Sequence, residues 1–122
     1  MSGSQREDFL LRQIQVIAAM LARMAGLRAE GDHVEARAEL NRTYAVLLDE
    51  QLEIVQRVDS DTAVMLLGAP VRARAYAELL IEQAEQESDA SRANCLRQRA
   101  SEVAAAAGGA MTAARRPQRS ES

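Results

Sequence analysis

The chain has 122 residues, with 15 basic and 18 acidic side chains and a formal net charge of −3 at pH 7. This length is enough for one domain with a single modest core, and the acidic balance argues against a general polyanion-binding protein. Aromatic residues make up 2% of the chain, so the core must be aliphatic, and the one cysteine excludes an internal disulfide, which fits a reducing, cytoplasmic setting.

Residues 4–27 carry the apolar pattern that the rest of the chain is expected to cover. One stripe recurs at alternating spacings of four and three residues, and a second stripe lies beside it on the same helix. The first stripe is Leu10, Ile14, Ile17, Leu21 and Met24, and the second is Phe9, Val16, Met20 and Leu27. Because two adjacent stripes need two neighbours, this helix is expected to belong to a bundle.

The start and the polar positions of this first segment define it further. Ser4 and Glu7 have the spacing of a capping box, which predicts a helix N-terminus at Ser4. Polar residues interrupt the apolar run, so we expect neither a membrane span nor a signal peptide. The interruptions are Arg12, Gln13, Gln15 and Arg23.

A tight turn is predicted after the first helix. Gly31 supplies a residue that tolerates positive φ, and Asp32 with Glu35 predicts the cap of a second, antiparallel helix over residues 33–58. The buried face of that helix is expected to hold Ala36, Leu40, Tyr44, Leu47, Ile54 and Val58, widened by Leu48, Leu52 and Val55. Near its middle, Asp49, Glu50 and Glu53 are interpreted as a solvated patch.

Three further segments complete the predicted fold. Residues 59–61 break the pattern, and a short helix over residues 62–67 is expected to end at Gly68. Pro70 opens a helix to Glu87, with apolar positions at Val71, Ala75, Tyr76, Leu79, Leu80 and Ala84. A last helix, with the stripe Ala93, Leu96, Ala100, Val103 and Ala107, is expected to begin at the cap Asp89 and to stop at Gly108-Gly109.

The predicted fold is all-α, with four main helices and one short helix in antiparallel hairpins. Residues 1–109 form its single domain, and residues 110–122 are expected to be a disordered, Arg-containing tail. The middle of a tetratricopeptide repeat resembles Gly31, Asp32, Ala36 and Leu40, and Asp89 with Ala93 echoes Asp32 with Ala36. No regular period of about 34 residues spans the chain, so we expect a TPR-like pairing of helices rather than a repeat array.

The chain also resembles a known group of small bacterial proteins. The resemblance lies in Asp8-Phe9-Leu10-Leu11-Arg12-Gln13-Ile14, in Glu30-Gly31-Asp32 and in Ala77-Glu78-Leu79-Leu80, and more loosely in residues 97–100. That family is a domain of unknown function built from TPR-like helical hairpins, and the resemblance covers about residues 8–104. It implies a helical fold and brings no catalytic residue. Where members often have Gly at the last hairpin turn, this chain has Ser88-Asp89.

Two candidate reactive residues have simple structural interpretations. His33, the only histidine, has no partners placed by the sequence for a metal or acid–base role, so we interpret it as solvated. Cys95 lies one turn from Arg92 and Arg99, which could lower the pKa of a nucleophilic thiol, but a small half-buried side chain is the preferred interpretation.

The acidic row Glu78, Glu82 and Glu85 shares one helix face. Carboxylates without a shaped cage bind cations weakly, so we interpret the row as a solvated face and expect no metal and no cofactor.

Two aromatic residues and the basic tail are the remaining candidates. Tyr44 and Tyr76 are expected to bury their rings with the hydroxyl groups at the edge of the core, or else to line a groove between hairpins. Arg115, Arg116 and Arg119 could touch nucleic acid, but three charges without a stacking platform or a reading helix argue against it.

The sequence predicts a non-enzymatic helical module that binds a protein, a peptide or itself, with a homodimer expected. The double-width face of the first helix is the reason, because apolar surface left uncovered tends to be used in association. The candidate interface or groove residues are Phe9, Val16, Met20, Leu27, Tyr44 and Tyr76. The alternative is a small-molecule sensor, regulator or enzyme with a site between hairpins near the two tyrosines.

Overall fold

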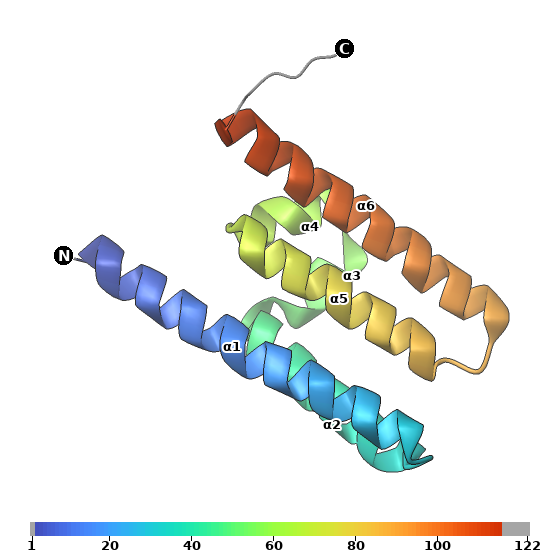
Figure 1. The fold of residues 1–122 in the computed structure, drawn as a ribbon. Helices are drawn as coiled ribbons and strands as arrows, with labels where there is room; N and C mark the ends of the chain where they lie inside the picture. Colours follow the sequence, from blue (N-terminus) through green and yellow to red (C-terminus); the bar gives the residue numbers. More distant parts are fainter. Residues whose placement is uncertain (1, 116–122) are drawn as a thin grey trace.

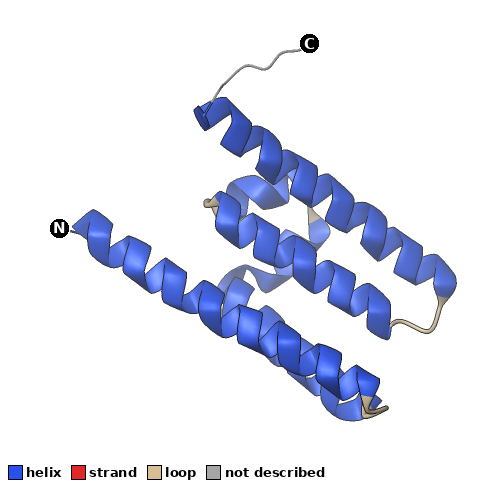
Figure 2. Ribbon diagram, viewed as in Figure 1, coloured by secondary structure: helices blue, strands red, loops and turns tan. Residues whose placement is uncertain are grey.

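The computed structural model describes residues 2–115, and side chains within residues 5–108. All regular structure in this range is helical, which confirms the all-α prediction (Figure 2). In chain order the elements are α1 Ser2–Ala29, α2 His33–Leu48, the 3-10 turn η1 Asp49–Gln51, α3 Leu52–Arg57, α4 Ser60–Leu67, α5 Pro70–Gln86 and α6 Ala90–Arg115.

Two long hairpins organise the fold, and the helix α5 lies at its centre. The antiparallel pair α1 and α2 forms one hairpin, α5 and α6 form the other, and the short helices α3 and α4 connect them behind α5 (Figure 1). The helix α5 contacts α1, α2, α4 and α6, and most of its side chains facing these helices are buried. The core is therefore assembled around α5, and α1 is one of its covering helices.

The helix α1 is buried along its second half only. Ile17 and Met24 of the predicted first stripe are fully buried, and α1 does contact two neighbours, α2 and α5. The helices α1 and α5 run in the same direction in Figure 1, with Arg28 beside Glu82, so Pro70 at the start of α5 lies level with about Val16. The turns of α1 before Val16 therefore extend beyond the start of α5 at Pro70.

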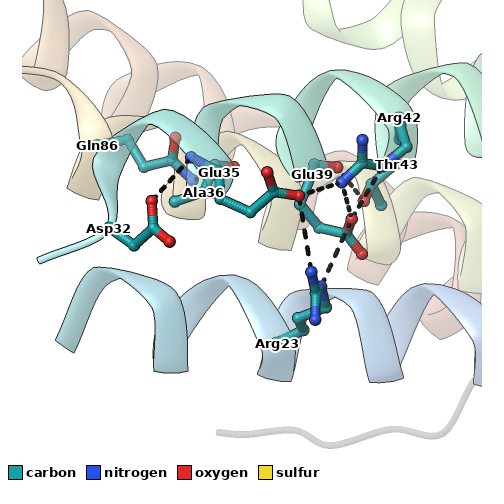
Figure 3. Close-up of polar contacts among 8 residues, drawn as sticks. All are labelled: Arg23, Asp32, Glu35, Ala36, Glu39, Arg42, Thr43 and Gln86. Carbon is teal, nitrogen blue, oxygen red and sulfur yellow. Dashed lines mark hydrogen bonds and ion pairs between the residues drawn. The ribbon is translucent and has the colours of Figure 1, made fainter. Parts of the chain in front are cut away.

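Local turn chemistry accounts for the α1–α2 turn. Gly31 has a φ of 79°, and the Asp32 amide donates to the Leu27 carbonyl at 2.9 Å, which closes the end of α1. The Asp32 carboxylate then accepts the Glu35 amide at 3.3 Å and caps α2 (Figure 3). The predicted turn is confirmed. Ser4, by contrast, lies inside α1, which begins at Ser2, so the predicted N-cap there is wrong.

The predicted second helix is divided into two helices. The helix α2 ends at Leu48, Asp49 adopts a φ of 49°, and the chain passes through η1 before α3 begins. The break shifts the phase of the apolar pattern, so that Val55 is fully buried while Ile54 is half exposed. The prediction of one continuous helix over residues 33–58 is therefore wrong, as is the buried position of Ile54.

The helices α5 and α6 begin as predicted, α4 begins at Ser60 rather than at residue 62, and α6 ends further on than predicted. Asp59 caps α4 by accepting the Thr62 amide at 2.9 Å, Gly68 closes α4 with a φ of 84°, and Pro70 begins α5. The helix α6 begins after the cap Asp89 and continues through the predicted Gly-Gly stop to Arg115. The predicted end at residue 107 is therefore wrong, and residues 116–122 of the predicted tail lie outside the described residues.

Candidate functional site

An apolar groove lies between the first half of α1 and the end of α2. It has a volume of about 250 Å³, and we refer to it as the α1–α2 groove. Its lining residues are Phe9, Arg12, Gln13, Val16 and Val46. The Gln13 side-chain amide donates to the Val46 carbonyl at 3.2 Å, which holds α1 beside α2 at the floor of this groove.

The apolar side chains at the groove are largely exposed to solvent. Phe9 is 61% exposed and Val16 is 51% exposed, and Leu11, on the opposite flank of α1, is 56% exposed. Both groove residues belong to the second predicted stripe, of which Met20 and Leu27 are partly buried. Neighbouring exposed apolar side chains beside a groove are typical of an interaction surface, whereas single ones are common on any protein.

A cluster of ion pairs lies further along the contact between α1 and α2, beyond the groove. The Arg42 guanidinium donates to Glu39 at 2.7 Å and to Glu35 at 2.9 Å, and Arg23 of α1 lies 3.6 Å from Glu35 and 3.8 Å from Glu39 (Figure 3). Only the Arg23 contacts cross from α1 to α2, and both arginines are more than half exposed, so solvent screens these pairs and they add little stability. The cluster neutralises this stretch and leaves the groove as its apolar part.

Glu82 of the predicted solvated acidic row is buried, so that interpretation is wrong for this residue. The Arg28 guanidinium donates to its two carboxylate oxygens at 2.6 and 3.0 Å, which raises the pKa of Arg28. Gln86 donates to the same carboxylate at 3.1 Å and to the Ala36 carbonyl at 3.2 Å. Glu82 therefore links α1 to α5, and Gln86 links α2 to α5. Its neighbours Glu78 and Glu85 are exposed, as predicted.

Two arginines that the sequence analysis did not interpret as structural bind the ends of helices. Arg99 of α6 donates to the carbonyls of Val55 and Val58, each at 2.7 Å, and to the Tyr76 hydroxyl at 3.3 Å. Arg72 of α5 donates to the Leu67 carbonyl at 2.9 Å and also to the carbonyl of Leu47. Partial burial lowers the pKa of Arg72. The guanidinium groups replace the hydrogen bonds that carbonyls lose where a helix stops.

The two tyrosines are buried, so neither contributes to an exposed interface. The Tyr44 and Tyr76 rings meet edge to face with centroids 6.4 Å apart, and the Tyr44 hydroxyl donates to Gln83 at 2.6 Å. Burial raises the pKa of the Tyr44 hydroxyl. The buried-ring interpretation is confirmed. Neither ring lines the α1–α2 groove or any of three further grooves formed by the described side chains.

His33 and Cys95 both lie on exposed surface. His33 begins α2 and lines a groove of about 640 Å³ with Arg37 and Glu85. Cys95 is exposed rather than half buried, because α6 presents that position to solvent, and the donor groups of Arg99 are bonded elsewhere. No group of three metal-binding side chains occurs among the described residues.

Another groove runs between α5 and α6. Its volume is about 460 Å³, and its lining residues are Arg74, Ala77, Glu78, Ile81, Arg97, Ala100, Ser101 and Ala104. Small side chains form its floor, and nothing in its mixed charges favours one kind of ligand. Of the predicted basic tail, Arg115 ends α6, while Arg116 and Arg119 lie outside the described residues.

The apolar helix α1 also meets the composition expected of a membrane span. Within the described part of the chain, residues Gln5–Ala29 form the one helix that is long and apolar enough. A mostly buried core helix of a soluble protein passes the same criteria, but only 11% of the apolar stretch is buried here; Ile17 and Met24 are the buried residues of this helix. The absence of a membrane span stays a prediction.

Comparison with protein-family models, with curated proteins and with solved structures finds no match to this chain. The functional argument therefore depends on the geometry of its own residues.

Proposed function

We propose that this chain is a non-enzymatic helical module that binds a protein, a peptide or a second copy of itself through the α1–α2 groove. The observation that carries this proposal is the exposure of Phe9 beside that groove, on turns of α1 that α5 does not cover. An exposed aromatic side chain next to an apolar groove is typical of a binding hot spot.

The proposed function does not require a small-molecule site. The alternative sensor or enzyme placed its ligand near Tyr44 and Tyr76, but these rings pack against each other in the core. We therefore favour the interaction module.

Binding from a native extract tests the proposed function. Full-length tagged chain, a Phe9→Ser variant and a matched Leu11→Ser variant are compared for the proteins they retain, including the untagged chain. Phe9 and Leu11 have similar exposure on opposite flanks of α1, so the two substitutions should have the same effect on folding. We expect Phe9→Ser alone to lose the bound protein. Equal retention by both variants, or none by the wild type, would refute binding through the groove.

We further propose that the two hairpins pack in a TPR-like manner. The contacts of α5 with both helices of the preceding hairpin support this arrangement, as do Gly31 and Asp32 at the turn and the buried Ala36 and Leu40 after it. From the resemblance of residues 8–14, 30–32 and 77–80 we also propose membership of the small bacterial family described above, and from the single cysteine a cytoplasmic setting. The amount of the chain in the soluble and membrane fractions of its native cell, measured by mass spectrometry, would test that setting.

A further inference from the structure

We propose that the partner of the α1–α2 groove is a second copy of this chain, paired antiparallel along α1 about a two-fold axis that lies level with Leu10, on the face that carries Phe9 and Arg12. Phe9 of each copy then enters the groove of the other, and Asp8 of each copy pairs with Arg12 of the other. This inference rests on the proposed function and names the partner.

The position of Phe9 along α1 fits this pairing. An antiparallel pair centred at Leu10 places each residue opposite the one equally far on the other side of the centre, so Phe9 of one copy is level with Leu11 of the other. Position 11 lies between Phe9 and Val16, the first and last residues of α1 that line the groove, so Phe9 of one copy is level with the groove of the other. One apolar side chain therefore meets one apolar groove twice in the same interface, as two-fold symmetry requires.

The charges beside the groove are self-complementary at the same centre. Asp8 and Arg12 are both exposed, and neither forms a hydrogen bond or ion pair with another side chain within residues 5–108. Each lies two positions from Leu10, so antiparallel pairing sets Asp8 of one copy against Arg12 of the other on both sides of the axis. A parallel pair would set like charges together, which costs affinity. The pattern thus selects both the partner and its orientation.

Space for the second copy is available at this end of the molecule. The turns of α1 before Val16 extend past the start of α5, and Figure 1 shows them projecting free of the second hairpin. A second α1 laid along them would join α1, α2 and its own α2 in a four-helix arrangement, which is a common way to bury such faces.

Sedimentation equilibrium of the full chain, from about 1 µM to about 1 mM, tests the pairing. We expect a reversible dimer. Phe9→Ser should weaken it by about a hundredfold or more, because each dimer loses two buried aromatic anchors. Leu11→Ser, on the opposite flank of α1, should leave the dissociation constant unchanged. Both positions are exposed in the single chain, so neither variant should unfold it.

Charge reversal tests the register independently of the apolar contact. Asp8→Arg alone and Arg12→Asp alone should each weaken the dimer by about tenfold, since two attractive contacts become repulsive. An equimolar mixture of the two variants should pair as tightly as the wild type, because every facing pair is again opposite in sign. The double variant Asp8→Arg/Arg12→Asp should likewise recover. Failure of both the mixture and the double variant to recover would overturn the proposed register.

Other occupants of the groove give distinct results. A wild-type chain that stays monomeric over the whole range overturns self-pairing, and retention of another protein through Phe9 would then leave the proposed function standing. A monomeric chain that sediments with vesicles of anionic phospholipid, and loses this on Phe9→Ser, overturns self-pairing in favour of a membrane surface. If the chain stays monomeric and retains nothing, both proposals fall.

Discussion

Glu82 occupies an environment that its neighbours on the same helix do not share. It accepts two hydrogen bonds from Arg28 and is 6% exposed, whereas Glu78, one turn earlier, faces solvent. We expect Glu82→Ala to lower the free energy of unfolding by about 2 kcal/mol, because charge-assisted bonds are lost and Arg28 is left without its partner. Glu78→Ala should change it by less than about 0.5 kcal/mol. Urea denaturation of both variants checks this, and equal effects would contradict it.

Arg99 gives a second prediction at the level of one side chain. Its guanidinium reaches two carbonyls and the Tyr76 hydroxyl at once, which one ammonium group cannot reproduce. Arg99→Lys should therefore lower the free energy of unfolding by about 1–2 kcal/mol, while Arg92→Lys at an exposed position of α6 should be nearly neutral. Thermal and urea unfolding distinguish the two, and a neutral Arg99→Lys would show that charge alone suffices.

These buried charges could not be predicted from the sequence. Helical period alone groups Glu82 with Glu78 and Glu85, and only the packing of α1 on α5 brings Arg28 to it across 54 positions of the chain. In the same way, Arg99 looked like a neighbour of Cys95, although the tertiary fold directs it to the end of α3.

At the scale of the element, two glycines of the first hairpin should respond to alanine in opposite directions. Gly31 holds a φ of 79° at the turn, so Gly31→Ala should destabilise the protein by about 1 kcal/mol. Gly26 lies inside α1 with open space where the methyl group of an alanine would lie, so Gly26→Ala should stabilise it by about 0.5–1 kcal/mol. Chemical denaturation measures both, and effects of the same sign would contradict the assignment of the turn.

The elements that the sequence predicted well are those whose boundaries depend on local chemistry. Gly31-Asp32, Gly68 and Pro70 act through chemistry within a few residues, and each lies where the prediction placed it. The break at Asp49 has no such signal, because apolar residues continue on both sides of it. The helix α6 passes through Gly108-Gly109 because each glycine costs a helix only about 1 kcal/mol, and alanines flank the pair.

At the scale of the whole molecule, protection from hydrogen exchange should differ along α1. In dilute solution the turns before Val16 have few buried contacts and should exchange faster than residues 17–29, which pack on α2 and α5. At concentrations where the chain associates, the same early turns should become protected. Mass spectrometry of peptides from α1 measures this, and uniform protection at low concentration would contradict the described packing.

The sequence predicted the double apolar face of α1, but the part of that face left uncovered depends on where α5 begins. The helical period shows which residues share a stripe, and it groups Phe9 and Val16 with Met20 and Leu27. Only the register of Arg28 with Glu82 shows that α5 stops short of the first turns. The candidate surface could thus be predicted as a stripe, and its extent could not.

The double hydrogen bonding of Arg72 has a mechanical consequence. One guanidinium joins the last turn of α2 to the last residue of α4, so the connector between the hairpins is clamped at both ends from α5. Bending at Asp49 would separate these carbonyls from their shared donor and leave them unsatisfied. A partner that docks on α1 therefore meets two hairpins whose connector is held in place from α5. The conformational entropy lost on docking comes chiefly from ordering the turns of α1 before Val16.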